Sequence, residues 1–291
     1  MIRKIGIFLE MIKFEHSIFA LPFAFVGAIL GAVVLEQRLP LWSEIGWIIL
    51  AMIGARSAAM GLNRLIDQAI DLRNPRTANR ALPAGLLKAG EVLVFIAISF
   101  VLLFVAAFRL DPLSVKLLPV AVFMLVIYSY TKRFTWLCHV VLGLTIGLAP
   151  LGGWVAITGR IDATALLLYL SVALWTAGFD IIYACQDADF DREEKLYSIP
   201  SRFGVATALW IARIFHLVTA VGFIVLFAVT DLSWGYLVGT LIAVAILFYE
   251  HTLVKPYDLS KLNMAFFTMN GVLSMVIFVF TLFDLVVLRK W

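Results

Sequence analysis

The sequence contains little charge. Only 14% of its 291 residues are Asp, Glu, Lys or Arg, whereas 63% are hydrophobic and the mean hydropathy is +1.01. A water-soluble domain carries about 25% charged residues, so this composition excludes an ordinary soluble protein. Apolar runs recur along the whole chain, and many approach the ~20 residues that a helix needs to cross a bilayer. We therefore expect a polytopic, all-α integral membrane protein that forms a single domain over residues 1–291.

Cysteine is also scarce, with Cys138 and Cys185 as the whole complement. Both fall in or near expected helices, which excludes a disulfide framework and a paired-cysteine metal site. His139, His216 and His251 have no metal-ligand spacing, and we expect them to be structural. No small-residue cleavage site follows the first apolar run, so no removable signal peptide is expected.

The apolar runs predict nine membrane spans. Pro, Gly or charged residues separate the runs, and neither a low-complexity segment nor a long linker points to a second domain. The spans are expected at about 17–35, 45–66, 91–109, 113–130, 136–157, 163–184, 205–229, 233–250 and 266–288.

Lys and Arg are distributed unevenly between alternate loops. Loops on the N-terminal side carry 15 of them, and those on the opposite side carry 6. Because cytoplasmic loops are enriched in Lys and Arg, this asymmetry predicts a cytoplasmic N-terminus and an external C-terminus. The expected location is the cell inner membrane.

A first acidic cluster ends the second apolar run, at Asn63, Asp67 and Asp71. A helix advances about 100° per residue, so side chains four positions apart drift by only about 40° and share one face. The loop bias places this face on the cytoplasmic side.

A second cluster follows the sixth run, in the segment DIIYACQDADFD. On a helix, Asp187 and Asp191 lie about 20° to either side of Asp180, so the three form one acidic stripe, whereas Asp189 points nearly opposite. The second pair of aspartates lies 120 positions after Asp67 and Asp71. This weak internal repeat predicts that the two clusters face each other.

Clustered carboxylates at the membrane suggest a bound cation. Carboxylates at membrane depth are costly and tend to be functional, and oxygen ligands favour Mg²⁺ or Mn²⁺ over zinc. Basic side chains accompany the acids, at Arg76 and Arg80 and again at Lys132 and Arg133. Acids and bases around one mouth favour a metal–diphosphate ligand over a bare cation.

Two other interpretations of the acids remain. They could serve only to cap helices and keep the loops hydrated, although two carboxylate pairs at i,i+4 spacing argue against this. They could also line the ion pathway of a secondary transporter. Transporters place such acids near the bilayer midplane, often at broken helices, whereas these lie at helix ends beside basic loops.

At these residues the chain resembles the UbiA superfamily of intramembrane prenyltransferases. The matching motifs are NDxxDxxxD, at Asn63, Asp67 and Asp71; DxxxD, at Asp187 and Asp191 with Asp180 upstream; and YxxxK, at Tyr128 and Lys132. The run RTANRALPAG looks like the corresponding segment of 4-hydroxybenzoate polyprenyltransferases. Arg64 stands where the family often has Asp, so metal binding through that position is not expected.

The resemblance implies nine helices in a ring around a central cavity, with Mg²⁺ and a polyprenyl diphosphate at its mouth. It implies metal ligands at Asn63, Asp67, Asp71, Asp187 and Asp191, with Asp180 as a further catalytic acid. Arg80 and Lys132 would bind phosphate oxygens, and Arg76, Tyr128 and Arg133 would complete the substrate site. Lys13, at the cytoplasmic start of the first span, is a candidate to face the acceptor.

The implied reaction is prenyl transfer to an aromatic acid in ubiquinone or menaquinone biosynthesis. The allylic cation would attack a ring carbon beside a hydroxyl, and Asp180 or Asp191 would remove the ring proton. The acceptor is expected to be 4-hydroxybenzoate, with a dihydroxynaphthoate or a porphyrin as alternatives. Arg56, inside the second span, either binds this acceptor or pairs with an acid such as Glu44. The lipid bilayer is the remaining expected partner, and no nucleic acid is expected.

Overall fold

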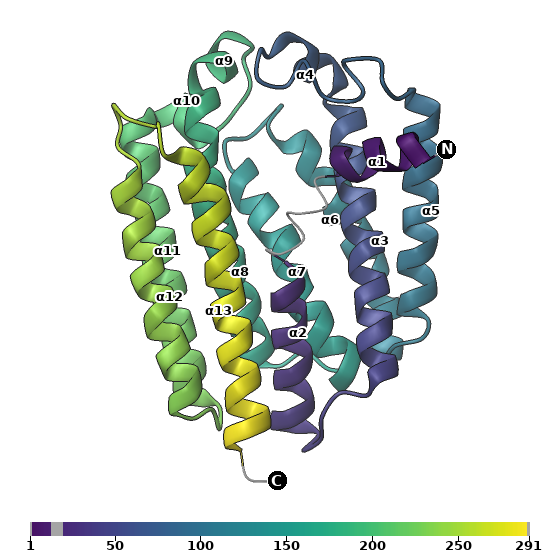
Figure 1. Ribbon diagram of the computed structural model, residues 1–291, viewed down its shortest axis with the longest axis vertical. Coiled ribbons are helices and arrows are strands. Elements are labelled where there is room, and N and C mark those ends of the chain that lie inside the picture. Colours follow the sequence, from purple (N-terminus) through teal and green to yellow (C-terminus); the bar gives the residue numbers. More distant parts are fainter. Residues whose placement is uncertain (1, 13–19, 290–291) are drawn as a thin grey trace.

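The computed structural model describes residues 2–12 and 20–289, and these residues form a bundle of helices (Figure 1). Within them, the single β pairing is the isolated bridge between Lys255 and Asp258. The helices are α1 (Ile2–Met11), α2 (Leu21–Leu30), η2 (Gly31–Leu35), α3 (Trp42–Ile66), α4 (Gln68–Arg73), α5 (Ala89–Ala107), α6 (Pro112–Thr131), α7 (Cys138–Thr158), α8 (Ala163–Ala184), η3 (Cys185–Asp187), α9 (Ala188–Glu193), α10 (Ile199–Phe203), α11 (Val205–Val229), α12 (Trp234–Leu253), η4 (Met264–Met269), α13 (Asn270–Phe283) and η5 (Asp284–Leu288).

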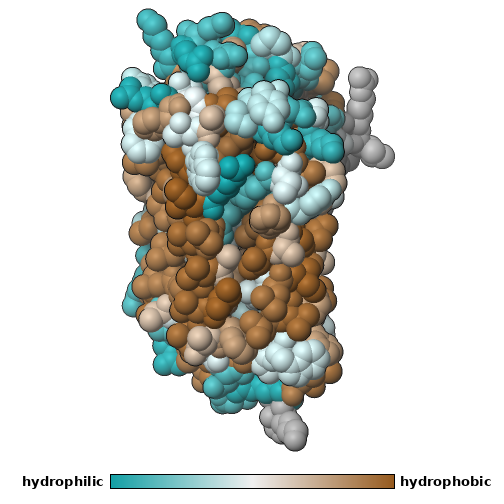
Figure 2. Space-filling view, turned by 90° about the vertical axis from the view of Figure 1, so that its left-hand side faces the viewer, coloured by the Kyte–Doolittle hydropathy of each residue, from teal (hydrophilic) through white to brown (hydrophobic). Residues whose placement is uncertain are grey.

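The chain is an integral membrane protein with apolar helices of membrane-spanning length. In the described part of the chain, eight helical segments are long and apolar enough to cross a bilayer, and Leu21–Leu35 forms a shorter ninth apolar helix. A hydrophobic band separates hydrophilic ends on the face seen in Figure 2. The predicted all-α fold is confirmed, and the expected first span, 17–35, begins among residues outside the described ranges.

Local sequence signals set several helix boundaries. The Asp111 carboxylate accepts a hydrogen bond from the Leu113 amide at 2.8 Å and so caps α6. Asp162 caps α8 in the same way, through the Ala165 amide at 2.9 Å. Gly159 ends α7 with a φ of +62°, in the left-handed region that favours glycine. These turns keep the helices close to the lengths predicted from hydropathy.

Small residues bring α2 and α7 into backbone contact. A Cβ atom at Gly27 would lie 2.0 Å from the Pro150 carbonyl oxygen, and one at Gly153 would lie 2.1 Å from that of Ala24. Such close approach is typical of helix pairs in membranes, where van der Waals contact replaces the hydrophobic effect. This contact fixes one wall of the central cavity.

The long helices surround the interior of the bundle. α7 packs between α2, α6 and α8, while α11, α12 and α13 lead from α8 back to α2. Phe23, Trp175 and Phe223 pack together in the core of that half, with ring centroids 5.0 and 6.0 Å from Phe23. The other half, between α2, α3, α6 and α7, is hollow. The predicted arrangement of helices around a cavity is therefore found.

Candidate active site

A polar cavity of about 830 Å³ opens beneath α4 and α9, at the same end of the bundle as α1. Side chains of both acidic clusters line it, together with those of the basic loops. The predicted residues that line it are Asn63, Asp67, Asp71, Arg76, Arg80, Tyr128, Lys132, Asp180, Asp187 and Asp191. The tertiary structure thus brings together two clusters that are 120 positions apart in the sequence.

The first aspartates of the two clusters have the same backbone conformation. Asp67 joins α3 to α4 with φ −92° and ψ 2°, and Asp187 joins η3 to α9 with φ −101° and ψ 5°. Both lie in the sparsely populated bridge region, where many active-site residues are found. The second cluster was expected on one continuous helix. The 3₁₀ turn Cys185–Asp187 interrupts that helix between α8 and α9, with Asp187 in the bridge region.

Asp67 is almost completely buried, at 2% exposure, and is surrounded by donors. Its Oδ2 accepts hydrogen bonds from Lys132 Nζ at 2.6 Å and from Asn63 Nδ2 at 3.0 Å. Its Oδ1 accepts from Arg133 Nη2 at 2.9 Å. Burying a carboxylate is costly, and partners such as these offset that cost.

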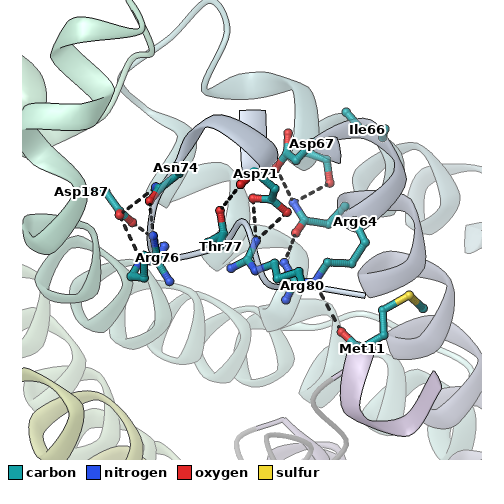
Figure 3. Close-up of polar contacts among 12 residues, drawn as sticks. Met11, Arg64, Ile66, Asp67, Asp71, Asn74, Arg76, Thr77, Arg80 and Asp187 are labelled. Atoms are coloured by element: carbon teal, nitrogen blue, oxygen red, sulfur yellow. Dashed lines mark hydrogen bonds and ion pairs between the residues drawn. The ribbon is translucent and has the colours of Figure 1, made fainter. Parts of the chain in front are cut away.

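Asp71 is held in a similar way by Arg80, whose Nη1 lies 2.7 and 2.8 Å from the two carboxylate oxygens (Figure 3). Arg64 projects into the same region and donates from Nη1 to the amide oxygen of Asn63 at 3.1 Å. That oxygen is the atom of Asn63 that could bind a cation. The residue that departs from the family motif therefore contacts the predicted ligand beside it.

Asp187 is held by residues of the first loop. Arg76 donates from Nη2 to Oδ2 at 2.6 Å and from Nε to Oδ1 at 3.0 Å, and Asn74 Nδ2 lies 3.2 Å from Oδ1 (Figure 3). The Arg76 guanidinium also lies over the ring of Tyr183, 5.4 Å from its centroid. Burial disfavours the charged guanidinium, but the hydrogen bonds and charge of Asp187 outweigh this and raise the pKa of Arg76.

Asp180 has a different kind of partner. Its Oδ2 lies 2.7 Å from Nδ1 of His139, a residue whose spacing gave no functional signal. Its position could have indicated a role in the site, because His139 is the second residue of α7 and this end of α7 lies at the cavity. Asp191 is half-buried in the same cavity, whereas the Asp189 side chain is 91% exposed and pairs with Arg192.

Two further predicted substrate-binding residues donate hydrogen bonds to backbone carbonyl oxygens. Tyr128 lines the cavity but donates its hydroxyl to the Ala59 carbonyl oxygen at 2.9 Å. Arg133 is not among the residues lining the cavity, and it braces Asp67 while donating to the Ser129 carbonyl oxygen at 2.7 Å. Lys13 lies outside the described residues.

A second, apolar chamber of about 290 Å³ adjoins the polar cavity. α2, α3, α6 and α7 enclose it, and alanine, leucine and isoleucine side chains form most of its wall. Arg56 and Tyr128 line both spaces and therefore lie where the two meet. One end of the combined space is charged and the other is hydrophobic, which suits an amphiphilic ligand.

Within the described ranges, no three His, Cys, Asp or Glu side chains stand close enough to hold a metal ion as they are arranged. The ion pairs explain this arrangement, because Lys and Arg side chains occupy oxygens of Asp67, Asp71 and Asp187. Acids and bases of the site therefore pair with one another. An anion with its own cations could exchange partners with these pairs without a large change in net charge.

Comparison with known proteins places this site in a family. The sequence pattern of the UbiA prenyltransferase family matches residues 20–272. A 4-hydroxybenzoate octaprenyltransferase of Aliivibrio fischeri (strain MJ11) is 31% identical over 234 residues, which cover 80% of this chain and 81% of that protein. The mitochondrial 4-hydroxybenzoate polyprenyltransferase of Arabidopsis thaliana is 34% identical over 183 residues, which cover 62% and 44% of the two chains.

Solved structures share the fold. The apo structure of a UbiA homolog from Aeropyrum pernix K1 is similar with a TM-score of 0.84 and 30% identity, over 93% of this chain and 98% of that one. A UbiA homolog from Archaeoglobus fulgidus bound to GPP and Mg²⁺ has a TM-score of 0.77 at 16% identity, over 97% and 100% of the two chains. Sequence, cavity and fold agree that this chain is an intramembrane prenyltransferase of the UbiA family.

Proposed function

We propose that the enzyme transfers a polyprenyl group from a polyprenyl diphosphate to an aromatic acid of the 4-hydroxybenzoate type, in quinone biosynthesis. The observation that carries this proposal is the convergence of two aspartate clusters and several basic side chains on one cavity that adjoins an apolar chamber. The curated relatives, named for 4-hydroxybenzoate, support the choice of acceptor.

The polar cavity would hold the diphosphate together with Mg²⁺. Carboxylate and amide oxygens are the donors that Mg²⁺ prefers, so Asn63, Asp67, Asp71, Asp187 and Asp191 fit as its ligands. A prenyl diphosphate together with Mg²⁺ is what the Archaeoglobus fulgidus homolog binds, which supports this pair of ligands for the cavity. When bound, Mg²⁺ would neutralise charge on the departing diphosphate.

Basic side chains of the cavity would bind the phosphate oxygens. Arg76, Arg80 and Lys132 each have a carboxylate partner in the cavity and could exchange it for phosphate. Arginine suits this role because its planar guanidinium forms paired hydrogen bonds with phosphate. Arg133 would act differently, by holding Asp67 in place from behind.

The apolar chamber would receive the prenyl chain. Its wall offers hydrophobic contact along α3, α6 and α7 and keeps water away from the allylic carbon. This matters because water would otherwise capture the carbocation.

Arg56 would recognise the acid group of the acceptor. It lies between the charged cavity and the apolar chamber, at membrane depth in α3. A cation in such surroundings is costly and commonly marks a binding site for an anionic group. The aromatic acid would lie between this guanidinium and the cavity acids, with Tyr128 lining the same space.

The cavity would face the cytoplasm of the cell membrane. The basic loops around it carry most of the Lys and Arg of the chain, which is the distribution typical of cytoplasmic loops. Both water-soluble substrate groups would then enter from the compartment where they are made.

A panel assay tests this function. The purified protein, in lipid nanodiscs with Mg²⁺ and geranyl diphosphate, is offered 4-hydroxybenzoate or 1,4-dihydroxy-2-naphthoate, and products are read by mass spectrometry. We expect a geranylated 4-hydroxybenzoate. Prenylation of the naphthoate alone would identify 1,4-dihydroxy-2-naphthoate as the acceptor. The absence of product with both acids would reject the proposal.

A further inference from the structure

We propose that His139 is a positioning residue that orients Asp180 to take the ring proton from the aromatic acceptor. This inference rests on the proposed function and deepens it, because it assigns the proton-removing step to one pair of side chains. His139 lies on α7 and Asp180 on α8, and both line the polar cavity.

The hydrogen bonds around His139 fix its tautomer. Its Nε2 lies 3.3 Å from the backbone N–H of Ile199, which can only donate, so Nε2 must accept and carry no proton. The ring proton is then on Nδ1, which donates to Asp180 Oδ2 at 2.7 Å. His139 is 3% exposed, so these two contacts also fix the plane of the ring. The contact with Nδ1 therefore holds the Asp180 side chain in one orientation.

Asp180 has a different partner from Asp67, Asp71 and Asp187. Lys132, Arg80 and Arg76 hold those three carboxylates through ion pairs. Asp180 is held instead by the imidazole of His139, which donates from Nδ1 to Oδ2.

The second oxygen of Asp180 is available to a substrate. The side chain is 23% exposed, and within residues 2–12 and 20–289 no hydrogen bond engages its Oδ1. A general base needs a free lone pair within hydrogen-bond reach of the proton that it removes. Oδ1 can therefore accept the proton of the substrate, while Oδ2 stays bound to His139 Nδ1.

The backbone around the pair holds it rigidly. The amide of Tyr197 donates to the Lys132 carbonyl oxygen at 2.7 Å, and the Cys138 thiol lies 3.4 Å from the Tyr197 carbonyl oxygen. Together with the contact between Ile199 and His139, these bonds join the α6–α7 turn to the segment before α10. These bonds hold the imidazole in position before any substrate binds.

The step assigned to this pair balances as follows. The allylic C–O bond of the donor breaks and its electron pair leaves with the diphosphate. A ring carbon beside the acceptor hydroxyl forms the new C–C bond to the allylic carbon. Asp180 Oδ1 then takes the proton from that ring carbon, and the C–H electron pair restores the aromatic ring. His139 keeps its own proton throughout.

Deuterated acceptor tests the assignment. Turnover of 4-hydroxybenzoate with deuterium at both ring positions beside the hydroxyl is compared with the unlabelled acid in wild type, His139→Leu and His139→Gln. We expect His139→Leu to lower kcat by about 10- to 100-fold with little change in KM for geranyl diphosphate, and to raise the deuterium isotope effect on kcat. The Gln amide can donate to Asp180 and accept from Ile199, so this variant should recover most of kcat and the small isotope effect.

The isotope effect is a ratio and does not depend on how much of a variant is folded. Asp189→Asn is the control, because the Asp189 side chain is 91% exposed, pairs with Arg192 and is not among the residues lining the cavity, and its isotope effect should equal that of wild type. Asp180→Asn should raise the isotope effect, and adding His139→Leu to it should cause little further loss, since both act on one group.

Additive losses in the double variant, or an unchanged isotope effect in His139→Leu, would overturn the inference and leave His139 as a loop support. An isotope effect that rises in Asp191→Asn and not in Asp180→Asn would also overturn it. In each case the wild-type enzyme still prenylates the acid, so the proposed function stands. If the wild type makes no product with either acid, the proposed function itself fails.

Discussion

Arg76 holds Asp187 across the mouth of the cavity through two hydrogen bonds, 2.6 Å from Nη2 to Oδ2 and 3.0 Å from Nε to Oδ1. The two residues are 111 positions apart in the sequence. Arg76 lies in the loop after the first acidic cluster, and Asp187 belongs to the second cluster. The pair joins the clusters directly and keeps both charges balanced while no substrate is bound. A diphosphate with its cations must exchange partners with it.

Replacing Arg76 tests this exchange. Hydrogen bonds to charged groups contribute about 1.5–3 kcal/mol, so Arg76→Gln should raise KM for the prenyl diphosphate by about 10- to 100-fold, with a smaller effect on kcat. Steady-state kinetics with the donor varied would measure this. Arg192→Gln is the control, because Arg192 pairs with the exposed Asp189. An unchanged KM in Arg76→Gln would show that its guanidinium stays with Asp187 during turnover.

Asp67→Asn should abolish turnover and also destabilise the fold. The substitution leaves the ammonium of Lys132 and the guanidinium of Arg133 beside a neutral amide, and removing one partner of a buried pair costs about 3–5 kcal/mol. Because both cations are partly exposed, the lower end of that range applies. Product formation and thermal unfolding in nanodiscs would measure the two effects.

The control for Asp67→Asn is Asp189→Asn, since the Asp189 side chain is 91% exposed. It should change neither activity nor unfolding temperature. Normal turnover in Asp67→Asn would contradict the role of the first cluster.

A bulky residue in the apolar chamber should shorten the accepted prenyl chain. Ala51 lines the chamber five residues before Arg56 on α3, about 7.5 Å further from the polar cavity. We expect Ala51→Phe to retain activity with geranyl diphosphate and to lose at least about 10-fold in kcat/KM with a much longer donor. Each methylene group of the donor that the chamber no longer buries costs about 0.8 kcal/mol of binding free energy. Competition between the two donors, read by mass spectrometry, measures the ratio.

Ile53→Phe is the matched control, because Ile53 is 40% exposed on another face of the same helix. Its donor preference should equal that of the wild type. Equal losses for both donors in Ala51→Phe would mean that the chamber does not hold the chain.

Mg²⁺ and diphosphate should stabilise the enzyme only together. Either ligand alone meets cavity charges that already pair with each other, whereas the two together replace these pairs with balanced charge. At 100 times the dissociation constant, a ligand specific to the folded state stabilises it by about 2.7 kcal/mol. Thermal unfolding with Mg²⁺, with inorganic diphosphate, with both, and with both plus a chelator would measure this. A full shift with diphosphate alone would exclude a metal from its site.

Much of this protein could be predicted from local sequence. The eight long apolar helices and Leu21–Leu35 agree closely with the predicted spans, because hydropathy over ~20 residues is a property of the segment itself. The spacing of Asn63, Asp67 and Asp71 likewise predicted a shared face, because helical periodicity needs no information from the rest of the chain. The repeat predicted that the two clusters face each other, and both clusters line one cavity. Asp67 and Asp187 also have matching backbone angles.

The partners of these acids were decided by tertiary structure. Arg76 pairs across the cavity with Asp187 and not with an acid of its own cluster, Arg133 braces Asp67 from outside the cavity, and His139 contacts Asp180. Each contact joins residues 41 to 111 positions apart. Their geometry depends on how closely the helices pack, as where Gly27 lets α2 touch α7. Composition and periodicity set which side chains reach the site, whereas helix packing set which atoms meet there, because a hydrogen bond depends on differences of a few tenths of an ångström that no local pattern encodes.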